Sequence, residues 1–228
     1  MNFDYLLRLG DDMLVLGHRL SEWCGHAPIL EEDIALANIA LDCIGQANAL
    51  LSLAGKVEGK GRTADDLAYF RDAMDFRNCL LVEQPNGDFA FTIARQFLFD
   101  AYSFHLYQAL QEGRHLELAA LAIKAVKEVR YHLRHSSEWT RRLGDGTEES
   151  HRRMQNAFEE LWPFTDELLV TDENVKPAWD KTVDEVLTSA TLVRPKTNGF
   201  RSCRHTEHLG RMLAEMQSLA RSLPGAQW

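Results

Sequence analysis

The sequence predicts an all-α fold, and three observations support this prediction. Only six of the 228 residues are proline, so long segments lack the residue that most strongly breaks helices. Apolar residues recur at spacings of three and four along most of the chain, which is the period of an amphipathic helix rather than a strand. The longest such pattern covers residues 116–143, where Leu118, Ala122, Val129 and Ser136 fall on one buried stripe.

Length and composition limit the domain organisation and the function classes. The chain is 45% hydrophobic and 26% charged, which is ordinary for a globular protein. Its length requires no more than one domain, and it has no fixed-period repeat, low-complexity tract or long linker. We therefore expect a single helical domain over residues 1–228. The formal net charge of −9 argues against nucleic-acid binding, which needs a basic surface.

Targeting and redox signals are weak. No apolar run approaches the length needed to span a bilayer, and the N-terminal segment has acids where a signal peptide has a basic start. The four cysteines, at positions 24, 43, 79 and 203, form no Cys-x-x-Cys pair, which is typical of reduced thiols. We expect a cytoplasmic protein that binds no membrane.

Each expected helix is bounded by local signals. Gly25 and Pro28 separate the first two helices, and three acids at residues 31–33 complement the dipole at the start of the second. A turn signal around Gly87 precedes the third long helix, and Pro163 kinks a later one. The expected helices cover residues 4–22, 31–55, part of 64–81, 89–110, 116–143, 148–170, 177–192 and 205–223.

Two of the long helices, at residues 31–55 and 89–110, carry a line of polar residues at helical spacing on an otherwise apolar surface, and the amphipathic helix at residues 116–143 carries a third such line beside its buried stripe. A mostly apolar helix of this kind is usually buried and turns its polar line inward. The lines are Asn38, Asp42 and Gln46; Thr92, Gln96, Asp100, Ser103 and Tyr107; and Glu128, His132 and His135.

Long helices with inward acids are typical of the ferritin-like di-iron bundle, so this site is the first chemistry to test. It requires a Glu from each of two helices and Glu-x-x-His from each of the other two. The acid candidates here are Asp42, Asp100, Glu128 and Glu159.

The histidine positions of that motif are not filled. Ser103 stands three residues after Asp100, and Trp162, whose indole has no lone pair for a metal, stands three after Glu159. His132 is spaced i+4 from Glu128 rather than i+3. We therefore predict no metal site, with the buried acids satisfied by Gln46, Gln96, Ser103 or His132.

Two further clusters have both a structural and a functional interpretation. His205, Glu207 and His208 could hold a surface zinc ion, but Thr206 is well placed to cap the last helix, with Glu207 in its acidic first turn.

The basic loop at residues 194–204 contains Arg194, Lys196, Arg201 and Arg204. It is either solvated or a contact for the phosphates of coenzyme A or for an acidic partner. No nucleotide-binding glycine motif or nucleophile elbow is present.

Four sequence blocks together resemble a known family. They are EWCGHAPILEEDIALANIALDCIGQA, LVEQPNGDFAFTIARQFLFDA, KAVKEVRYHL and HTEHLGRMLAEMQSLARSLPGAQW, which begin at residues 22, 81, 124 and 205. They are similar to the C subunits of the phenylacetyl-CoA 1,2-epoxidase complexes of phenylacetate degradation. The resemblance covers essentially the whole chain.

The resemblance implies a ferritin-like fold and a structural role. It implies a tight hetero-oligomer with a homologous catalytic A subunit that holds the di-iron centre, with a B subunit, and with a reductase E that binds transiently and carries flavin and an Fe–S cluster. The assembled monooxygenase would use O2 and NADPH to epoxidise phenylacetyl-CoA, while the isolated chain would be inactive.

We therefore predict a ferritin-like four-helix bundle with flanking helices, and no catalytic, cofactor-binding or metal-binding residue on this chain. The first and last helices are the expected docking faces. The alternatives are a self-sufficient di-iron oxygenase or oxidase, and an acyl-CoA-binding module that uses residues 194–204.

Overall fold

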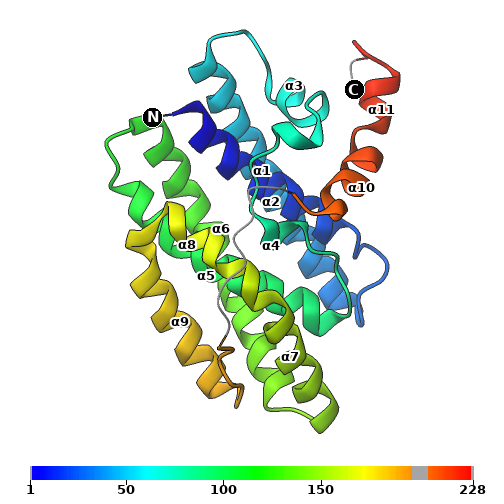
Figure 1. Cartoon of the computed structure of the whole chain (residues 1–228), viewed down its shortest axis with the longest axis vertical. Helices are drawn as coiled ribbons and strands as arrows, with labels where there is room; N and C mark the ends of the chain where they lie inside the picture. The colour runs from blue at the N-terminus through cyan, green and yellow to red at the C-terminus, as the bar shows by residue number, and fades with distance from the viewer. Residues whose placement is uncertain (1, 197–204, 227–228) are drawn as a thin grey trace. The chain divides into compact units, whose positions relative to one another are not determined.

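The computed structural model describes residues 2–196 and 205–226, and its contacts group into two compact units (Figure 1). The first unit is Met1–Pro85 with Ser202–Trp228, and the second is Asn86–Arg201. The described residues form α- and 3-10 helices and no strand, which confirms the all-α, ferritin-like fold class. That the two units make one domain stays a prediction.

The first unit is built on a long helix pair, α1 (Phe3–Ser21) and α2 (Leu30–Glu58), which pack along one another (Figure 1). Asn2 caps α1 by accepting a hydrogen bond from the backbone N–H of Asp4. Gly17 lets the two helices approach closely, because a Cβ there would lie 3.2 Å from the backbone carbonyl oxygen of Ala40. A left-handed Gly59 ends α2.

The rest of this unit is short helices and loops. The segment that follows α2 holds α3 (Ala64–Tyr69), a 3-10 turn (Ala73–Asp75) and α4 (Leu80–Glu83), so the short helix expected within residues 64–81 is present as α3. The helix expected at residues 205–223 is divided into two helices, α10 (Glu207–Met216) and α11 (Ser218–Ser222). The break is at Gln217, whose buried side chain donates to the carbonyl oxygens of Ala68 and Arg71, 3.0 Å from each.

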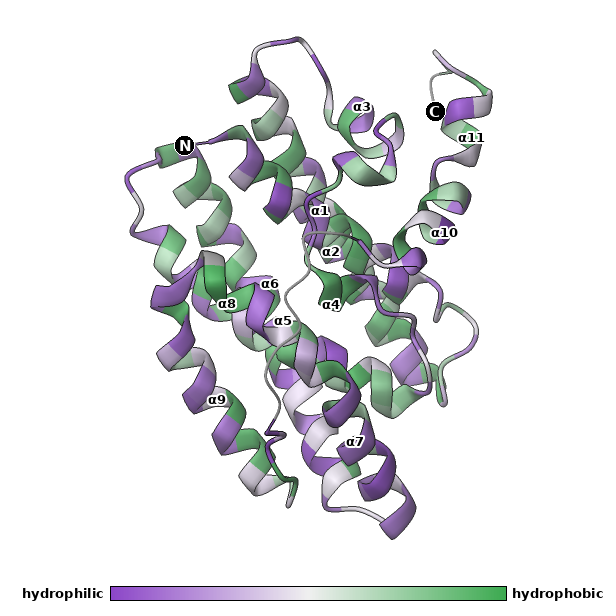
Figure 2. Ribbon diagram, viewed as in Figure 1, coloured by the Kyte–Doolittle hydropathy of each residue, from purple (hydrophilic) through white to green (hydrophobic). Residues whose placement is uncertain are grey.

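The second unit is built on α5 (Phe89–Gln111) and α6 (Leu116–Gly144). Against both helices pack α7 (Glu148–Leu161) and α9 (Lys176–Ser189). The expected kink at Pro163 is a 3-10 turn, Trp162–Phe164, which divides the expected helix into α7 and α8 (Thr165–Thr171). The exposed side of α7 is strongly hydrophilic (Figure 2), whereas its Met154 and Phe158 are fully buried.

One expectation about the membrane is wrong as stated. Among the described residues α2 is long and apolar enough to cross a bilayer by length and composition, whereas the sequence had indicated no such run. Half of the most apolar 18-residue window of this helix is buried inside the chain. A core helix of a globular protein meets the same criteria of length and composition as a membrane-spanning helix. The helix is apolar because many of its positions, such as Leu36, Ile39 and Leu50, are core positions.

Candidate functional site

The polar line of α5 forms a buried cluster, which is the candidate site. All five of its members are buried, as the spacing predicted: Thr92, Gln96, Asp100, Ser103 and Tyr107. They lie on one side of the helix because they are spaced by four, four, three and four residues. The facing helix of the same unit, α6, contributes Ser136 and the buried His132.

Asp100 is the centre of this cluster. Gln96 Nε2 donates to one carboxylate oxygen at 2.6 Å, and the Ser136 hydroxyl donates to the other at 2.8 Å. Burial raises the pKa of Asp100 from 3.8 to about 6, an effect that the charge of His132 and these two hydrogen bonds oppose in part. Above that pH the chain holds a carboxylate in its interior and stabilises it with neutral hydrogen-bond donors.

This arrangement does not fit a di-iron centre. Both oxygens of Asp100 already accept hydrogen bonds, and the next polar residue along the helix is Ser103, a hydroxyl rather than an imidazole. The Ser103 hydroxyl and the Gln96 carbonyl oxygen are buried and lack a hydrogen-bond partner in the described structure. In residues 2–196 and 205–226, no three His, Cys, Asp or Glu side chains are grouped so that they could hold a metal ion.

The other acid candidates differ in position. Asp42 and Glu128 are half-buried, but Glu159 is exposed on α7, where it accepts a hydrogen bond from Gln155. The expectation that Glu159 points inward is therefore wrong. The buried positions of α7 are Met154, Ala157, Phe158 and Leu161, and Glu159 falls outside that face.

The polar line of α2 is only partly internal. Gln46 is buried, Asp42 is half-buried and Asn38 is exposed, so the prediction is wrong for Asn38. On α6, His132 is buried, while Glu128 and His135 are half-buried. In the second unit, the acid that the structure brings to the centre of a polar network is Asp100.

The histidine cluster at the start of α10 has a structural role. Nδ1 of His205 hydrogen-bonds to a carboxylate oxygen of the fully buried Glu83, and its Nε2 donates to the Phe76 carbonyl oxygen at 2.9 Å. Both ring nitrogens are therefore engaged with protein groups, which leaves neither for zinc. Thr206 occupies the N-cap position as predicted, but its side chain donates to Glu83 instead of accepting from the helix.

Sequence reasoning missed a group of buried charges in the first unit. Asp11 forms a buried ion pair with Arg71 and also accepts from the backbone N–H of Arg77 at 2.8 Å. Burial raises the pKa of Asp11, and Arg71 opposes that rise. The next residue, Asp12, accepts from the backbone N–H of Cys79 at 2.7 Å. These carboxylates hold the irregular segment before α4 in place. The sequence signal for this group was the pair of adjacent acids inside an otherwise apolar helix.

The basic loop is only partly described, since residues 197–204 lie outside the described ranges and include Arg201 and Arg204. Arg194 is described, and it pairs with Asp184 at 2.7 Å and with Asp180. Its guanidinium also lies over the rings of Trp162 and Trp179. Arg194 is thus an internal anchor, and the phosphate-binding interpretation does not hold for this residue.

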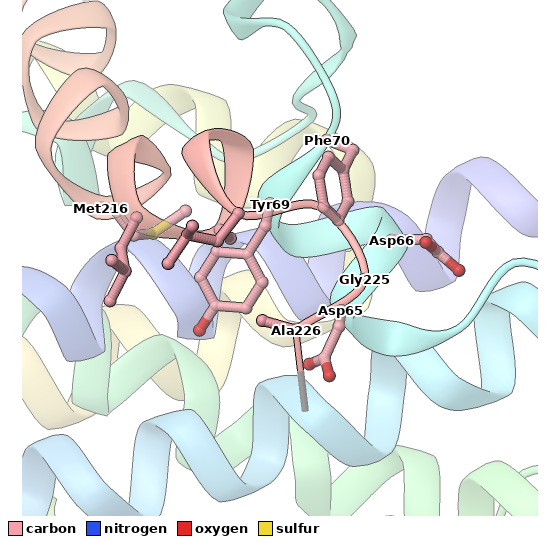
Figure 3. Close-up of a pocket in the computed structure, with 10 residues that line it drawn as sticks. Asp65, Asp66, Tyr69, Phe70, Met216, Gly225 and Ala226 are labelled. Atoms are coloured by element: carbon pink, nitrogen blue, oxygen red, sulfur yellow. The ribbon is translucent and has the colours of Figure 1, made fainter. Parts of the chain in front are cut away.

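A cavity of about 600 Å3 lies between α3 and the last helices of the first unit. Figure 3 shows Tyr69 in the middle of its lining, with Met216 on one side and Asp65 and Asp66 on the other. Its remaining lining is apolar or glycine, and none of the described residues that line it is cationic. Carboxylates at the rim repel the phosphates of coenzyme A, so this cavity does not suit an acyl-CoA.

The fold and this interior together define a class of protein: an all-α, ferritin-like chain with a buried polar network around Asp100. A family model described as "Phenylacetic acid catabolic protein" matches residues 1–228. The chain is 50% identical to the C subunit of the 1,2-phenylacetyl-CoA epoxidase of Escherichia coli strain K12, over 98% of each chain. It belongs to the phenylacetic acid catabolic protein family.

Proposed function

We propose that this chain is a structural, non-catalytic subunit of a multicomponent phenylacetyl-CoA epoxidase. Membership of the family and the name of the E. coli relative support a role in phenylacetate catabolism and in a multisubunit enzyme. The observation that carries the non-catalytic assignment is the environment of Asp100. Its oxygens are occupied by Gln96 and Ser136, and Ser103 stands where a di-iron motif needs histidine.

In this proposal the catalytic A subunit is the permanent partner. The B subunit and the reductase E complete the cytoplasmic enzyme. The di-iron centre belongs to A, the flavin and Fe–S cluster belong to E, and this chain binds no cofactor. Its contribution is to bury a face of A and hold that protein in its active arrangement.

The exposed apolar line of α2 supports such a permanent interface. Leu30, Ile34 and Leu41 are 70%, 53% and 66% exposed, and their spacings of four and seven place them on one side of the helix. Obligate interfaces are large and apolar. This face replaces the first helix as the expected docking surface, because the apolar residues of α1, such as Leu6 and Leu20, are buried within this chain.

The test is the iron content of the chain, expressed alone in iron-rich medium and purified without a chelator, followed by co-purification with the catalytic subunit. We expect far less than one iron per chain and a defined complex with the catalytic subunit. About two irons per chain, the content of an intact carboxylate bundle, would instead indicate a self-sufficient di-iron oxygenase. A stable monomer that does not bind the catalytic subunit would contradict the structural role.

A further inference from the structure

The outward side of α6 carries a basic stripe, and Glu128 and Glu138 follow its first and last members by four residues. Lys124, Lys127, Arg130 and Arg134 are all exposed and are spaced by three, three and four residues. They therefore share the side of the helix opposite to its buried positions, which include Val129. Four positive charges within three helical turns are unusual on a chain whose formal net charge is −9.

These four cations differ from most others on this chain because none of them forms an ion pair with a carboxylate in the described structure. None of the four lies within 4 Å of an Asp or Glu oxygen among the residues that the structure describes. Many exposed cations elsewhere have such partners, for example Arg152 with Glu149 at 2.8 Å and Lys176 with Asp180 at 2.7 Å.

Apolar and aromatic side chains complete this surface. Tyr131 and Ile123 are 43% and 50% exposed beside the stripe. The guanidinium of Arg134 lies over the Tyr131 ring, with 5.5 Å between its carbon and the ring centroid, and that of Arg130 lies 5.9 Å from the centroid of Phe104. Such contacts hold the two arginines in place and reduce the entropy that they lose on binding. Arginine and tyrosine are also the residues most enriched at the energetic centres of interfaces.

We infer that the stripe formed by Lys124, Lys127, Arg130 and Arg134 is a docking surface for a transiently bound protein partner that presents a cluster of carboxylates. The unneutralised charge selects an acidic surface and accelerates its encounter with this chain. The charge also distinguishes this surface from a permanent interface, which would be large and apolar. A protein is favoured over nucleic acid or an anionic membrane because the rest of the chain is strongly acidic and repels a long polyanion.

The inference rests on the proposed function only for the identity of the assembly in which this partner takes part. The variant that tests it replaces all four cations of the stripe with glutamine. A matched control replaces four exposed cations that lie beside carboxylates and removes the same charge: Lys60→Gln, Arg142→Gln, Lys181→Gln and Arg211→Gln.

The first measurement is the affinity of the full-length chain for poly-L-glutamate by fluorescence anisotropy, at low and at physiological salt. We expect salt-sensitive binding that the stripe variant weakens at least about tenfold while the control keeps it. An equal loss in both variants would show attraction to net charge alone and would overturn the inference. Tighter binding to duplex DNA of matched charge, or to vesicles with anionic lipid, would also overturn it, in favour of those partners.

The second measurement uses the components of the epoxidase assembly. A water-soluble carbodiimide joins a lysine amine directly to a neighbouring carboxylate, so docking should produce cross-links from Lys124 or Lys127 to acidic residues of another component. The comparison lysines are Lys60 and Lys181, which are equally accessible. An assembled complex that cross-links only through the comparison lysines would refute the inference. If no complex forms, the proposed function fails, and the polyglutamate result still decides whether the stripe binds carboxylates.

Discussion

Replacing the central carboxylate of the buried cluster should stabilise the protein at neutral pH. Burial raises the pKa of Asp100 from 3.8 to about 6. The folded chain therefore holds this proton more tightly than the unfolded chain, and stability is lost as pH rises from about 4 through about 6. Because one pKa unit corresponds to about 1.36 kcal/mol, the ionised carboxylate lowers the free energy of unfolding by about 3 kcal/mol above pH 7.

Asparagine at position 100 removes this cost and fits the available hydrogen bonds. Its carbonyl oxygen can accept from the Ser136 hydroxyl, as the carboxylate does now. Its amide can donate to Gln96 once that side chain turns its amide over, because the Gln96 carbonyl oxygen is buried without a hydrogen-bond partner in the described structure. Asp100→Asn should therefore raise the free energy of unfolding by about 2 kcal/mol at pH 7.5, somewhat less than the full cost of the charge.

Urea unfolding followed by tryptophan fluorescence measures this difference, at low protein concentration and between pH 5 and pH 8. The advantage of Asp100→Asn should grow as the pH rises and become constant above about pH 7. The matched control is Asp65→Asn, on an exposed carboxylate, which should change stability little at any pH. A variant less stable than the wild type at neutral pH would refute the reasoning, because the ionised carboxylate would then contribute to stability instead of lowering it.

Three further predictions concern packing and buried charge. On α2, Gly55→Ala should destabilise the chain by about 1–3 kcal/mol, because the added Cβ would collide with the carbonyl oxygen of Arg62. At Gly45 the added Cβ meets no atom, so Gly45→Ala should stabilise the helix by up to about 1 kcal/mol. Thermal unfolding of both variants measures the difference. Glu83→Gln should cost about 2 kcal/mol, because the fully buried Glu83 carboxylate accepts hydrogen bonds from Asn78 and Thr206 and contacts His205, and limited proteolysis should then release the C-terminal helices first. Arg194→Ala should lower the free energy of unfolding by about 1–2 kcal/mol, because ion pairs and ring contacts are lost. Calorimetry should show the same affinity for coenzyme A in this variant as in the wild type. A weaker affinity would restore the phosphate-contact interpretation.

The parts of the interior that follow from local periodicity were predictable from the sequence. The polar line of α5 lies within a single apolar helix, so its spacing alone indicated that Gln96, Asp100 and Ser103 are buried together. The errors at Asn38 and Glu159 have a local cause. Each residue was predicted to be buried from the spacing of acids or amides alone. The apolar residues of the same helix determine which side is buried, and neither Asn38 nor Glu159 lies on that side.

The long-range polar pairs could not be predicted in this way. Glu83 and His205 are 122 residues apart, and Asp11 and Arg71 are 60 apart. Their meeting depends on how loops return to the first helix pair, which no short-range pattern encodes. Asp11 in α1 and Glu83 in α4 nevertheless sit among apolar neighbours, and a buried charge in such a place requires a partner once the chain folds.

The two exposed surfaces make different physical demands on this protein. The apolar line of α2, with Leu30 and Leu41 about two-thirds exposed, is unfavourable in water and gains free energy whenever another chain covers it. The basic stripe of α6, centred on Lys127 and Arg130, is well solvated by itself, and covering it removes water from charges that must be re-paired. The first surface therefore favours a contact that does not open, and the second favours one that forms quickly and separates again. In the proposed structural role, the chain would contribute to the enzyme through these two kinds of contact, one that holds the assembly together and one that a partner forms and breaks repeatedly.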